Sequence, residues 1–190
     1  MNRAIALFDF DGTLVTGDSL PTFIACCVGW PRTVATALFA VLVTLHAADR
    51  RTAFKALWLR LTLRGFPLAR LPAAQEKLAQ QLQWLRQQHE RLLWHKQRGD
   101  IIVIASGGLD IYLAAFLRDI APDHILCTVM EQGAEVLTGV MQGGNCVRAE
   151  KKRRVAELLH SLEPHAEVWA YGNLPHDLPM MDLATHRVIV

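Results

Sequence analysis

Two aspartates lie one residue apart in the stretch LFDFDGT, directly after an apolar run. The carboxylates of Asp9 and Asp11 would repel each other at that spacing, and burial would raise the free energy of each charge. A magnesium ion, which prefers oxygen ligands, would relieve this repulsion. One carboxylate could then attack phosphorus, while the other protonates the leaving oxygen and later activates water. The pair indicates phosphoryl chemistry, with a strand-ending turn as the alternative.

Other polar residues with suitable chemistry follow later apolar runs. Ser106 and Gly107 come after IIVIA, Asn173 and Asp177 come after AEVWAY, and Lys151 begins an amphipathic stretch. A hydroxyl and exposed backbone N–H groups can bind phosphate oxygens, and a lysine can neutralise phosphate charge. Catalysis of phosphoryl transfer is mostly positioning and electrostatic stabilisation, which such a set can supply. A solvated helix face is the alternative for the lysine.

The elements that would position these residues alternate between strand and helix. The predicted strands lie at residues 3–8, 101–105, 124–130, 135–141, 166–171 and 187–190. The predicted helices between them lie at residues 109–119, 150–161 and 178–184. This alternation predicts an α/β fold with a parallel sheet, and the two strands at 124–141 are expected to form a hairpin. Because ligands bind beyond the carboxyl ends of parallel strands, the polar residues should converge at one edge.

A helical block interrupts this pattern between the first and second strands. Its clearest helix is predicted over 73–98, where leucines recur at helical spacing and Gly99 follows as a stop. The segment 33–48 is strongly apolar but shorter than the roughly 20 residues that span a bilayer. We expect a buried helix there, with an interfacial helix that touches lipid as the alternative.

Four motifs occur in order along the chain: DFDGT, IASGG, a lysine before a helix, and YGNLPHDLPMMDLA. They resemble the motifs of the haloacid dehalogenase (HAD) superfamily, in its phosphoserine phosphatase-like branch, subfamily IB. The resemblance implies a Rossmann-like α/β core at residues 1–16 and 99–190 and a helical cap, residues 17–98, inserted after the first strand. It also implies a Mg²⁺-dependent phosphatase, a phosphoric monoester hydrolase that forms an aspartyl-phosphate intermediate.

The same resemblance implies a role for each motif residue. Asp9 would be the nucleophile and Asp11 the general acid and base, while Ser106, Gly107 and Lys151 would bind phosphate. The metal ligands would be Asp9, Asp11 through its backbone carbonyl, Asn173 and Asp177.

Two positions in these motifs need comment. Lys151 is preferred to Lys152 because it lies five residues after Cys146, which is the spacing in this branch. Asn173 departs from the family, which usually carries an aspartate that binds magnesium there. An amide oxygen can still ligate the ion but brings no negative charge. We expect weaker metal affinity with activity retained, and a weakly active or non-catalytic HAD-like binding protein is the alternative.

The substrate depends on the cap. In phosphoserine phosphatases an acid shortly after the first motif holds the amino group, and a cap arginine holds the carboxylate. Asp18 and Arg60 are the candidates for these two roles, which favours a small organic phosphate such as phosphoserine. Asp18 could equally be the N-cap of the first cap helix, because aspartate is favoured at that position.

The apolar residues of the cap favour a second substrate class. The stretches TFIACCVGW and TVATALFAVLVTLHAA carry few polar groups, and a run of cations follows them. These cations are Arg50, Arg51, Lys55, Arg60 and Arg64. An apolar stretch beside cations is typical of a surface for anionic lipid. A membrane-surface phosphatase acting on phospholipids, such as phosphatidylglycerophosphate, is therefore an alternative, unless these residues only build the core of the cap.

The composition limits the remaining possibilities. The formal net charge of +2 gives no argument for nucleic acid as a partner, and the four cysteines show no C-x-x-C pair. No signal peptide is recognisable before the first apolar run, so we expect a cytoplasmic protein with reduced cysteines, in peripheral contact with the inner membrane surface under the lipid alternative. The histidines show no zinc-binding spacing, and the sequence carries no signal of oligomeric state.

Overall fold

The computed structural model describes residues 3–162 and 166–190, and its centre is a six-stranded sheet with the order β4-β3-β2-β1-β5-β6. The strands are β1 (Ile5–Phe8), β2 (Ile101–Leu109), β3 (His124–Gln132), β4 (Leu137–Gln142), β5 (Val168–Gly172) and β6 (His186–Ile189). β4 pairs antiparallel with β3, and the other pairs are parallel. The predicted α/β fold and the predicted hairpin are confirmed.

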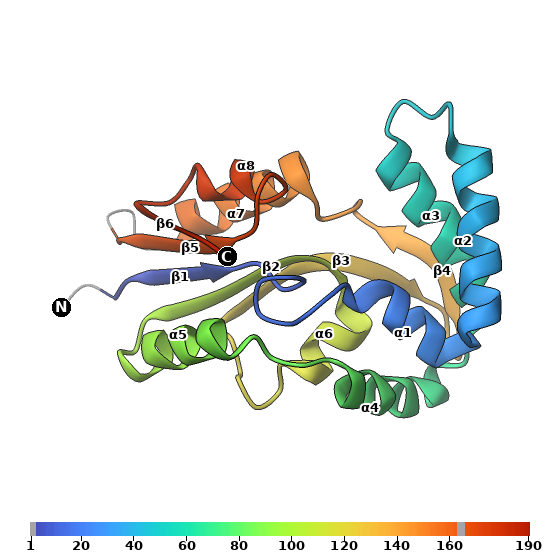
Figure 1. Cartoon of the computed structure of the whole chain (residues 1–190), viewed down its shortest axis with the longest axis horizontal. Coiled ribbons are helices and arrows are strands. Elements are labelled where there is room, and N and C mark those ends of the chain that lie inside the picture. Colours follow the sequence, from blue (N-terminus) through green and yellow to red (C-terminus); the bar gives the residue numbers. More distant parts are fainter. Residues whose placement is uncertain (1–2, 163–165) are drawn as a thin grey trace.

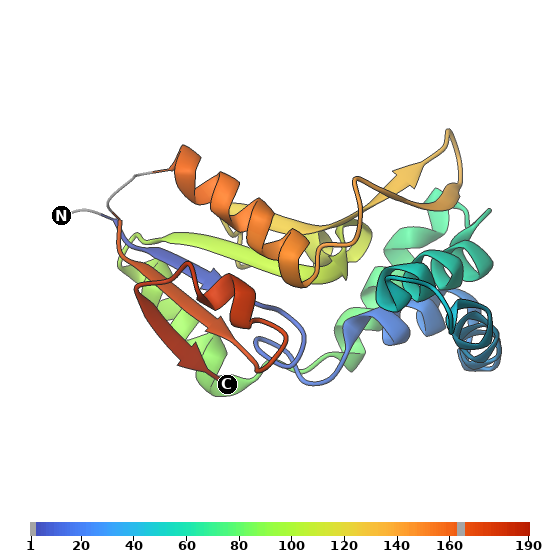
Figure 2. The same cartoon turned by 90° about the horizontal axis from the view of Figure 1, so that it is seen from above.

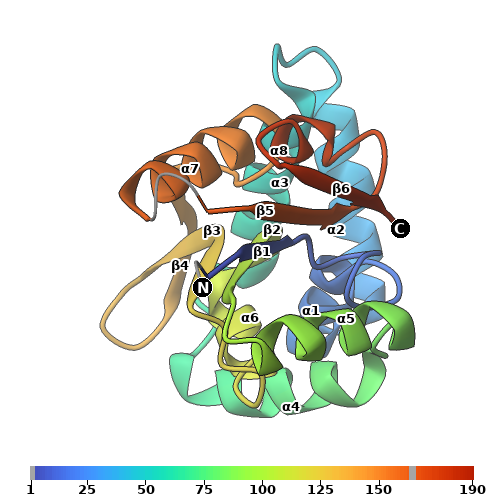
Figure 3. The ribbon, with the colours of Figure 1, turned by 90° about the vertical axis from the view of Figure 1, so that its left-hand side faces the viewer.

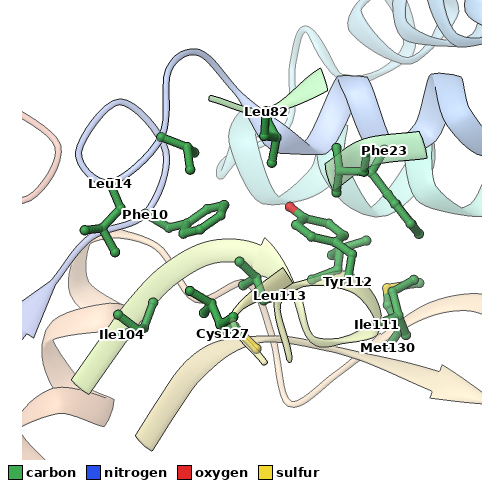
Figure 4. Packing of buried hydrophobic residues seen from close by; sticks show 14 of the residues in the cluster. Phe10, Leu14, Phe23, Leu82, Ile104, Ile111, Tyr112, Leu113, Cys127 and Met130 are labelled. Atoms are coloured by element: carbon green, nitrogen blue, oxygen red, sulfur yellow. The ribbon is translucent and has the colours of Figure 1, made fainter. Parts of the chain in front are cut away.

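Helices cover both faces of the sheet (Figure 3). α7 (Arg148–Ser161) and α8 (Leu178–Met181) lie on one face, and α5 (Arg86–Gln97) and α6 (Asp110–Phe116) lie on the other. β1 is buried at all four positions because it lies between β2 and β5 under both helical layers. Figure 4 shows part of the larger core, in which Phe10, Ile104 and Leu113 are fully buried.

The insert after β1 is helical, as predicted. It contains α1 (Ser19–Val28), α2 (Trp30–Thr44), α3 (Arg50–Leu63), a short 3-10 helix (Leu68–Arg70) and α4 (Leu71–Gln81). α1, α2 and α3 pack against one another beyond the carboxyl ends of the strands (Figure 1). The division into a core and a cap remains a prediction, and residues 1–2 and 163–165 of the predicted core lie outside the described residues.

The single helix predicted over 73–98 is wrong, because α4 and α5 are separate helices. The segment between them is extended and pairs with the loop after β1. Thr16 N donates to Gln83 O at 2.9 Å, and Leu85 N donates to Leu14 O at 2.8 Å. These contacts with a distant segment replace the helical hydrogen bonds there. The break lets α5 turn back onto β2, so the last part of the predicted cap packs against the sheet.

The prediction of a buried helix over 33–48 is also wrong for most of its side chains. α2 buries only Thr33, Ala40 and Thr44, because it packs on its neighbours from one side and lies at the outer end of the molecule (Figure 2). Its opposite side exposes large apolar side chains, including Leu42 at 68%. Within the described residues, no helix is both long and apolar enough to cross a membrane.

Candidate active site

A cavity of about 340 Å³ lies where the carboxyl ends of the central strands meet the helical insert. The sheet side contributes Asp9, Asp11, Gly107, Asn145, Val147, Arg148, Lys151, Asn173, His176 and Asp177, and the insert contributes Asp18, Leu20, Arg51, Phe54, Lys55 and Trp58. The parallel register of β2, β1 and β5 brings their following loops together. The structure therefore brings residues of all four motifs to one cavity at this edge, as the sequence predicts, although Ser106 of the second motif does not line it.

Lys151 holds two carboxylates together at the floor of the cavity. Its Nζ lies 2.7 Å from Asp9 Oδ1 and 2.7 Å from Asp177 Oδ1, and all three side chains are buried. Burial alone would lower the pKa of Lys151, but the two carboxylates raise it above its usual value. The lysine is therefore a fixed cation. Thr13 donates to the other Asp9 oxygen at 3.2 Å, which fixes the direction in which that carboxylate points.

Asp11 has a different environment from Asp9. Burial raises the pKa of Asp11 to about 7, and the nearby carboxylate of Asp18 adds to this shift. Ser19 N donates to Asp11 Oδ1 at 2.8 Å, which holds the side chain beside the start of α1. A carboxyl that titrates near neutral pH can both donate and accept a proton, as a general acid and base must. Burial raises the pKa of Asp9 as well, but Asp9 is held against the Lys151 cation, so the two aspartates are suited to different steps.

The loop at the end of β2 forms the next wall. Gly107 lines the cavity, and a Cβ there would lie 2.9 Å from Val147 Cγ1, so a larger residue would fit only if the Val147 side chain moved. The Ser106 hydroxyl is fully buried and accepts a hydrogen bond from Gly108 N at 2.9 Å. Ser106 does not line the cavity itself, and its side chain instead shapes the loop that presents Gly107.

Sequence reasoning did not assign Lys55, Asn145, Arg148 or His176 to this site, and Lys55 makes the most contacts with the opposite wall. It reaches from α3 to the sheet side, where it donates to Gly107 O, to Thr128 Oγ1 at 3.0 Å and to Asn145 Oδ1 at 2.9 Å. Burial lowers its pKa to about 8. The helical period contains a signal, because Lys55 shares a face with the buried residues Trp58 and Leu59. A lysine at a buried helical position indicates a specific partner.

The oxygen atoms near Asn173 are of the chemical types that bind a magnesium ion. Asn173 Nδ2 donates to Asp11 O at 3.3 Å, so the amide lies beside the carbonyl that the family motif assigns to the metal. Both Asn173 and the Asp9 carboxylate line the cavity, so an amide oxygen and a carboxylate are available on the same side as Asp11 O. Carboxylate, carbonyl and amide oxygens are ligands typical of Mg²⁺. The described residues contain no cluster of three or more His, Cys, Asp or Glu side chains that could hold a metal. Asn173 adds an amide to this set where a carboxylate would add a negative charge.

Asp177 is held by protein groups at both of its oxygens. Oδ1 lies 2.7 Å from Lys151 Nζ, and Oδ2 accepts from Asn173 N at 3.0 Å. A Cβ at Gly172 would lie 2.7 Å from Asp177 Cβ, so the strand end and this side chain are in close contact. These contacts fit a role for Asp177 in positioning Lys151, and its role as a metal ligand stays a prediction.

The two residues predicted to bind the rest of the substrate differ in position. Asp18 lines the cavity, and it is also the N-cap of α1, where it accepts from Leu20 N at 3.1 Å. The structure does not bring Arg60 to the cavity. Arg60 lies five residues after Lys55, on another side of α3, and borders a separate hollow beside β4. Arg51 and Arg148 are instead the arginines that line the site.

Solved structures share this architecture at low sequence identity. A protein of unknown function from Bordetella pertussis Tohama I aligns with 100% of this chain and 90% of its own at 20% identity, with a TM-score of 0.84. Phosphoserine phosphatase in its apo form aligns with 99% and 86% at 17% identity, with a TM-score of 0.68. A phospho-aspartyl intermediate analogue of phosphoserine phosphatase aligns with 100% and 87% at 17% identity, with a TM-score of 0.67. These similarities show the fold.

Comparison at the level of sequence gives the family. No curated protein sequence matches the chain. The family model described as haloacid dehalogenase-like hydrolase matches residues 6–182, which contain the first three motifs and all but the last two residues of the fourth. The predicted resemblance is confirmed. With nearly its whole length matched, the chain belongs to the haloacid dehalogenase-like hydrolase family.

Proposed function

We propose that this protein is a Mg²⁺-dependent phosphomonoester hydrolase that acts through an aspartyl-phosphate on Asp9. The observation that carries the proposal is the buried group in which Lys151 lies 2.7 Å from both Asp9 and Asp177. A lysine fixed beside the Asp9 carboxylate can hold that carboxylate and a bound phosphate in line. Asp11, two residues further along the chain, supplies a carboxyl whose pKa lies near 7.

Two steps follow from this arrangement. Asp9 attacks phosphorus, the bond between phosphorus and the leaving oxygen breaks, and Asp11 gives its proton to that oxygen. Asp11, now a carboxylate, takes a proton from water as the water attacks the phosphorus of the acyl phosphate. Inorganic phosphate leaves, and both aspartates return to their starting states. Phosphatases of this family generally use Mg²⁺, which when bound would offset the charge of the phosphate oxygens.

The expected substrate is a small organic phosphate such as phosphoserine. The cavity has the volume for such a molecule, and Arg51 and Arg148 can attract an anionic group. Asp18 lines the cavity and uses one carboxylate oxygen, Oδ1, to accept the N-cap hydrogen bond from Leu20 N. Its other oxygen can accept a hydrogen bond from an amino group of the substrate. The similarity in fold to phosphoserine phosphatase supports this choice.

A specific observation favours a second candidate, the phospholipid monoester. Leu20, Phe54 and Trp58 line the same cavity as the cations, so half of the residues in its wall on the insert side are apolar. A zwitterion as small as phosphoserine would leave these side chains without apolar contacts, whereas the glycerol and acyl part of a lipid would cover them. The two candidates share the chemistry at phosphorus and differ only in the group that the insert contacts.

One panel tests the proposal. Turnover of an aryl phosphate, phosphoserine and a phosphatidylglycerophosphate in mixed micelles is measured with and without Mg²⁺ for the wild type, Asp9→Asn and Asp119→Asn. Asp119 is exposed and lies outside the cavity, so it is the matched control. We expect Mg²⁺-dependent turnover that Asp9→Asn abolishes and Asp119→Asn preserves. If the wild type turns over no phosphate, the proposal fails and the non-catalytic binding protein remains.

A further inference from the structure

The outer side of α2 is an apolar surface that the described residues do not cover. We call it the α2 face, and it consists of Trp30, Val34, Leu38, Phe39, Val41, Leu42, Val43 and Leu45. Leu38 is 63% exposed and Leu42 is 68% exposed. Single exposed apolar residues are ordinary, but a contiguous group on one helix indicates an interaction site.

The helical insert that carries the α2 face is rich in cations and poor in acids, and two of its arginines lie beside the face. From Ser19 to Gln75 the sequence contains Asp49 as its one acidic residue, against seven basic ones. The basic residues are Arg32, Arg50, Arg51, Lys55, Arg60, Arg64 and Arg70. Arg50 and Arg51 lie directly against the apolar side chains, because they share a hollow with Val41, Leu45 and Phe54. The surface therefore combines apolar area with positive charge.

This combination decides between the occupants that could cover the α2 face. A second copy of the chain in a two-fold contact would place the same arginines opposite each other, and their repulsion would oppose the apolar contact. An anionic bilayer satisfies both properties, because its acyl layer accepts apolar side chains and its headgroups attract arginines. α2 has 15 residues, which suits a helix lying in the plane of the interface.

We propose that the α2 face docks into the surface of an anionic bilayer, with Arg50 and Arg51 among the headgroups. Docking in this way also orients the candidate active site. Arg51 and Phe54 line both the hollow beside α2 and the cavity that contains Asp9. The bound protein therefore holds the mouth of that cavity against the headgroup layer. The docking is a property of the surface and does not require the proposed catalysis.

Co-sedimentation with vesicles tests the docking. The full chain is mixed with vesicles of phosphatidylcholine alone, or with vesicles that also contain phosphatidylglycerol. We expect binding to the anionic vesicles, weaker binding at high salt, and little binding to phosphatidylcholine alone. The double variant Leu38→Ser/Leu42→Ser should weaken binding at least roughly tenfold, because it removes two inserted side chains, and Arg50→Glu should weaken it as well.

Matched controls separate docking from misfolding and from self-association. Leu93→Ser changes an exposed leucine on α5, away from α2, and should bind vesicles like the wild type. Thermal unfolding shows that each variant is folded. Equal binding by wild type and the Leu38→Ser/Leu42→Ser variant would overturn the proposal. The proposal would also be overturned if the wild type formed a dimer in sedimentation velocity and the Leu38→Ser/Leu42→Ser variant did not. A second copy of the chain would then cover the α2 face.

Discussion

β2 and α2 are two apolar segments that differ in their exposure to solvent. Both contain long runs of apolar residues, yet Ile104 of β2 is 0% exposed whereas Leu42 of α2 is 68% exposed. β2 lies between β1 and β3 with helices on both faces, so every direction from it holds a partner. α2 lies at the outer end of the molecule and has neighbours on one side only (Figure 2). Apolar composition therefore leads to burial only where the topology supplies partners.

The same contrast applies to charge. At the end of the central strands, the buried cation Lys151 has two carboxylate partners at 2.7 Å. Around α2, the arginines greatly outnumber the acids. The buried cation at the sheet edge is thus paired within the chain, which suits a preorganised reaction site. The apolar side chains of the α2 face have no such partner among the described residues. The predictions below test this contrast, beginning with the largest expected effect.

Removing the charge of Lys151 should cause the largest loss of stability among these changes. Lys151→Met leaves Asp9 and Asp177 as uncompensated buried carboxylates, so we expect the free energy of unfolding to fall by about 3–5 kcal/mol at neutral pH. Lys152→Met is the control, because its side chain is 41% exposed and lies 3.8 Å from Asp182. Urea unfolding of both variants gives the comparison. A similar loss in the two would show that Lys151 is not the buried partner of Asp9.

Truncation of one apolar side chain in each segment measures the contrast directly. Ile104→Ala opens a cavity in a core that is filled on all sides, and should lower the free energy of unfolding by about 2–5 kcal/mol. Leu42→Ala removes an exposed side chain, and should change the free energy of unfolding by less than about 0.5 kcal/mol in the absence of lipid. The measurement is again urea unfolding. A large loss for Leu42→Ala in the isolated protein would mean that α2 is covered in solution.

These two segments also show what the sequence can predict. The strands follow from the apolar runs in the sequence. The meeting of the polar residues that come after those strands follows from the geometry of a parallel sheet. The exposure of α2 does not, because the segment's own residues contain no information about which sides its neighbours occupy. The break between α4 and α5 likewise depends on hydrogen bonds from Thr16 and Leu85 to partners far along the chain.

Side chains in the insert were the hardest part of the site to predict. Arg60 and Lys55 are both cations of one helix, and only the helical period separates the one that faces the cavity from the one that does not. Lys151 and Lys152 differ in the same way, and the motif spacing favoured the lysine that the structure buries against Asp9. The role of each of these cations depends on the side of the helix from which it projects, and the structure shows that side.

Adding a charge beside the sheet edge should strengthen metal binding. Asn173→Asp supplies a carboxylate in place of an amide next to Asp11 O, so we expect Mg²⁺ to bind roughly tenfold more tightly. Isothermal titration of Mg²⁺ into the two proteins measures this without substrate. Unchanged or weaker affinity in the variant would show that this side chain does not face the ion.

The pH dependence of turnover tests the role of Asp11. Its pKa of about 7 keeps the carboxyl protonated below that pH, so the acid that protonates the leaving oxygen is lost as the pH rises. With an alkyl phosphate at saturation, we expect kcat to fall roughly fivefold between pH 7 and pH 8. A nitrophenyl phosphate, whose phenolate leaves without a proton, should show a smaller decline. Identical profiles for the two substrates would remove Asp11 from this role.

The central claim is that Asp9 carries the phosphoryl group. Acid-quenched reactions with a ³²P-labelled aryl phosphate measure this directly when label on the protein is followed in the wild type, Asp9→Asn and Asp11→Asn. We expect label that hydroxylamine releases, highest in Asp11→Asn, which can form the acyl phosphate but cannot activate water. We expect none in Asp9→Asn. Label on Asp9→Asn, or turnover by that variant at the wild-type rate, would contradict the account.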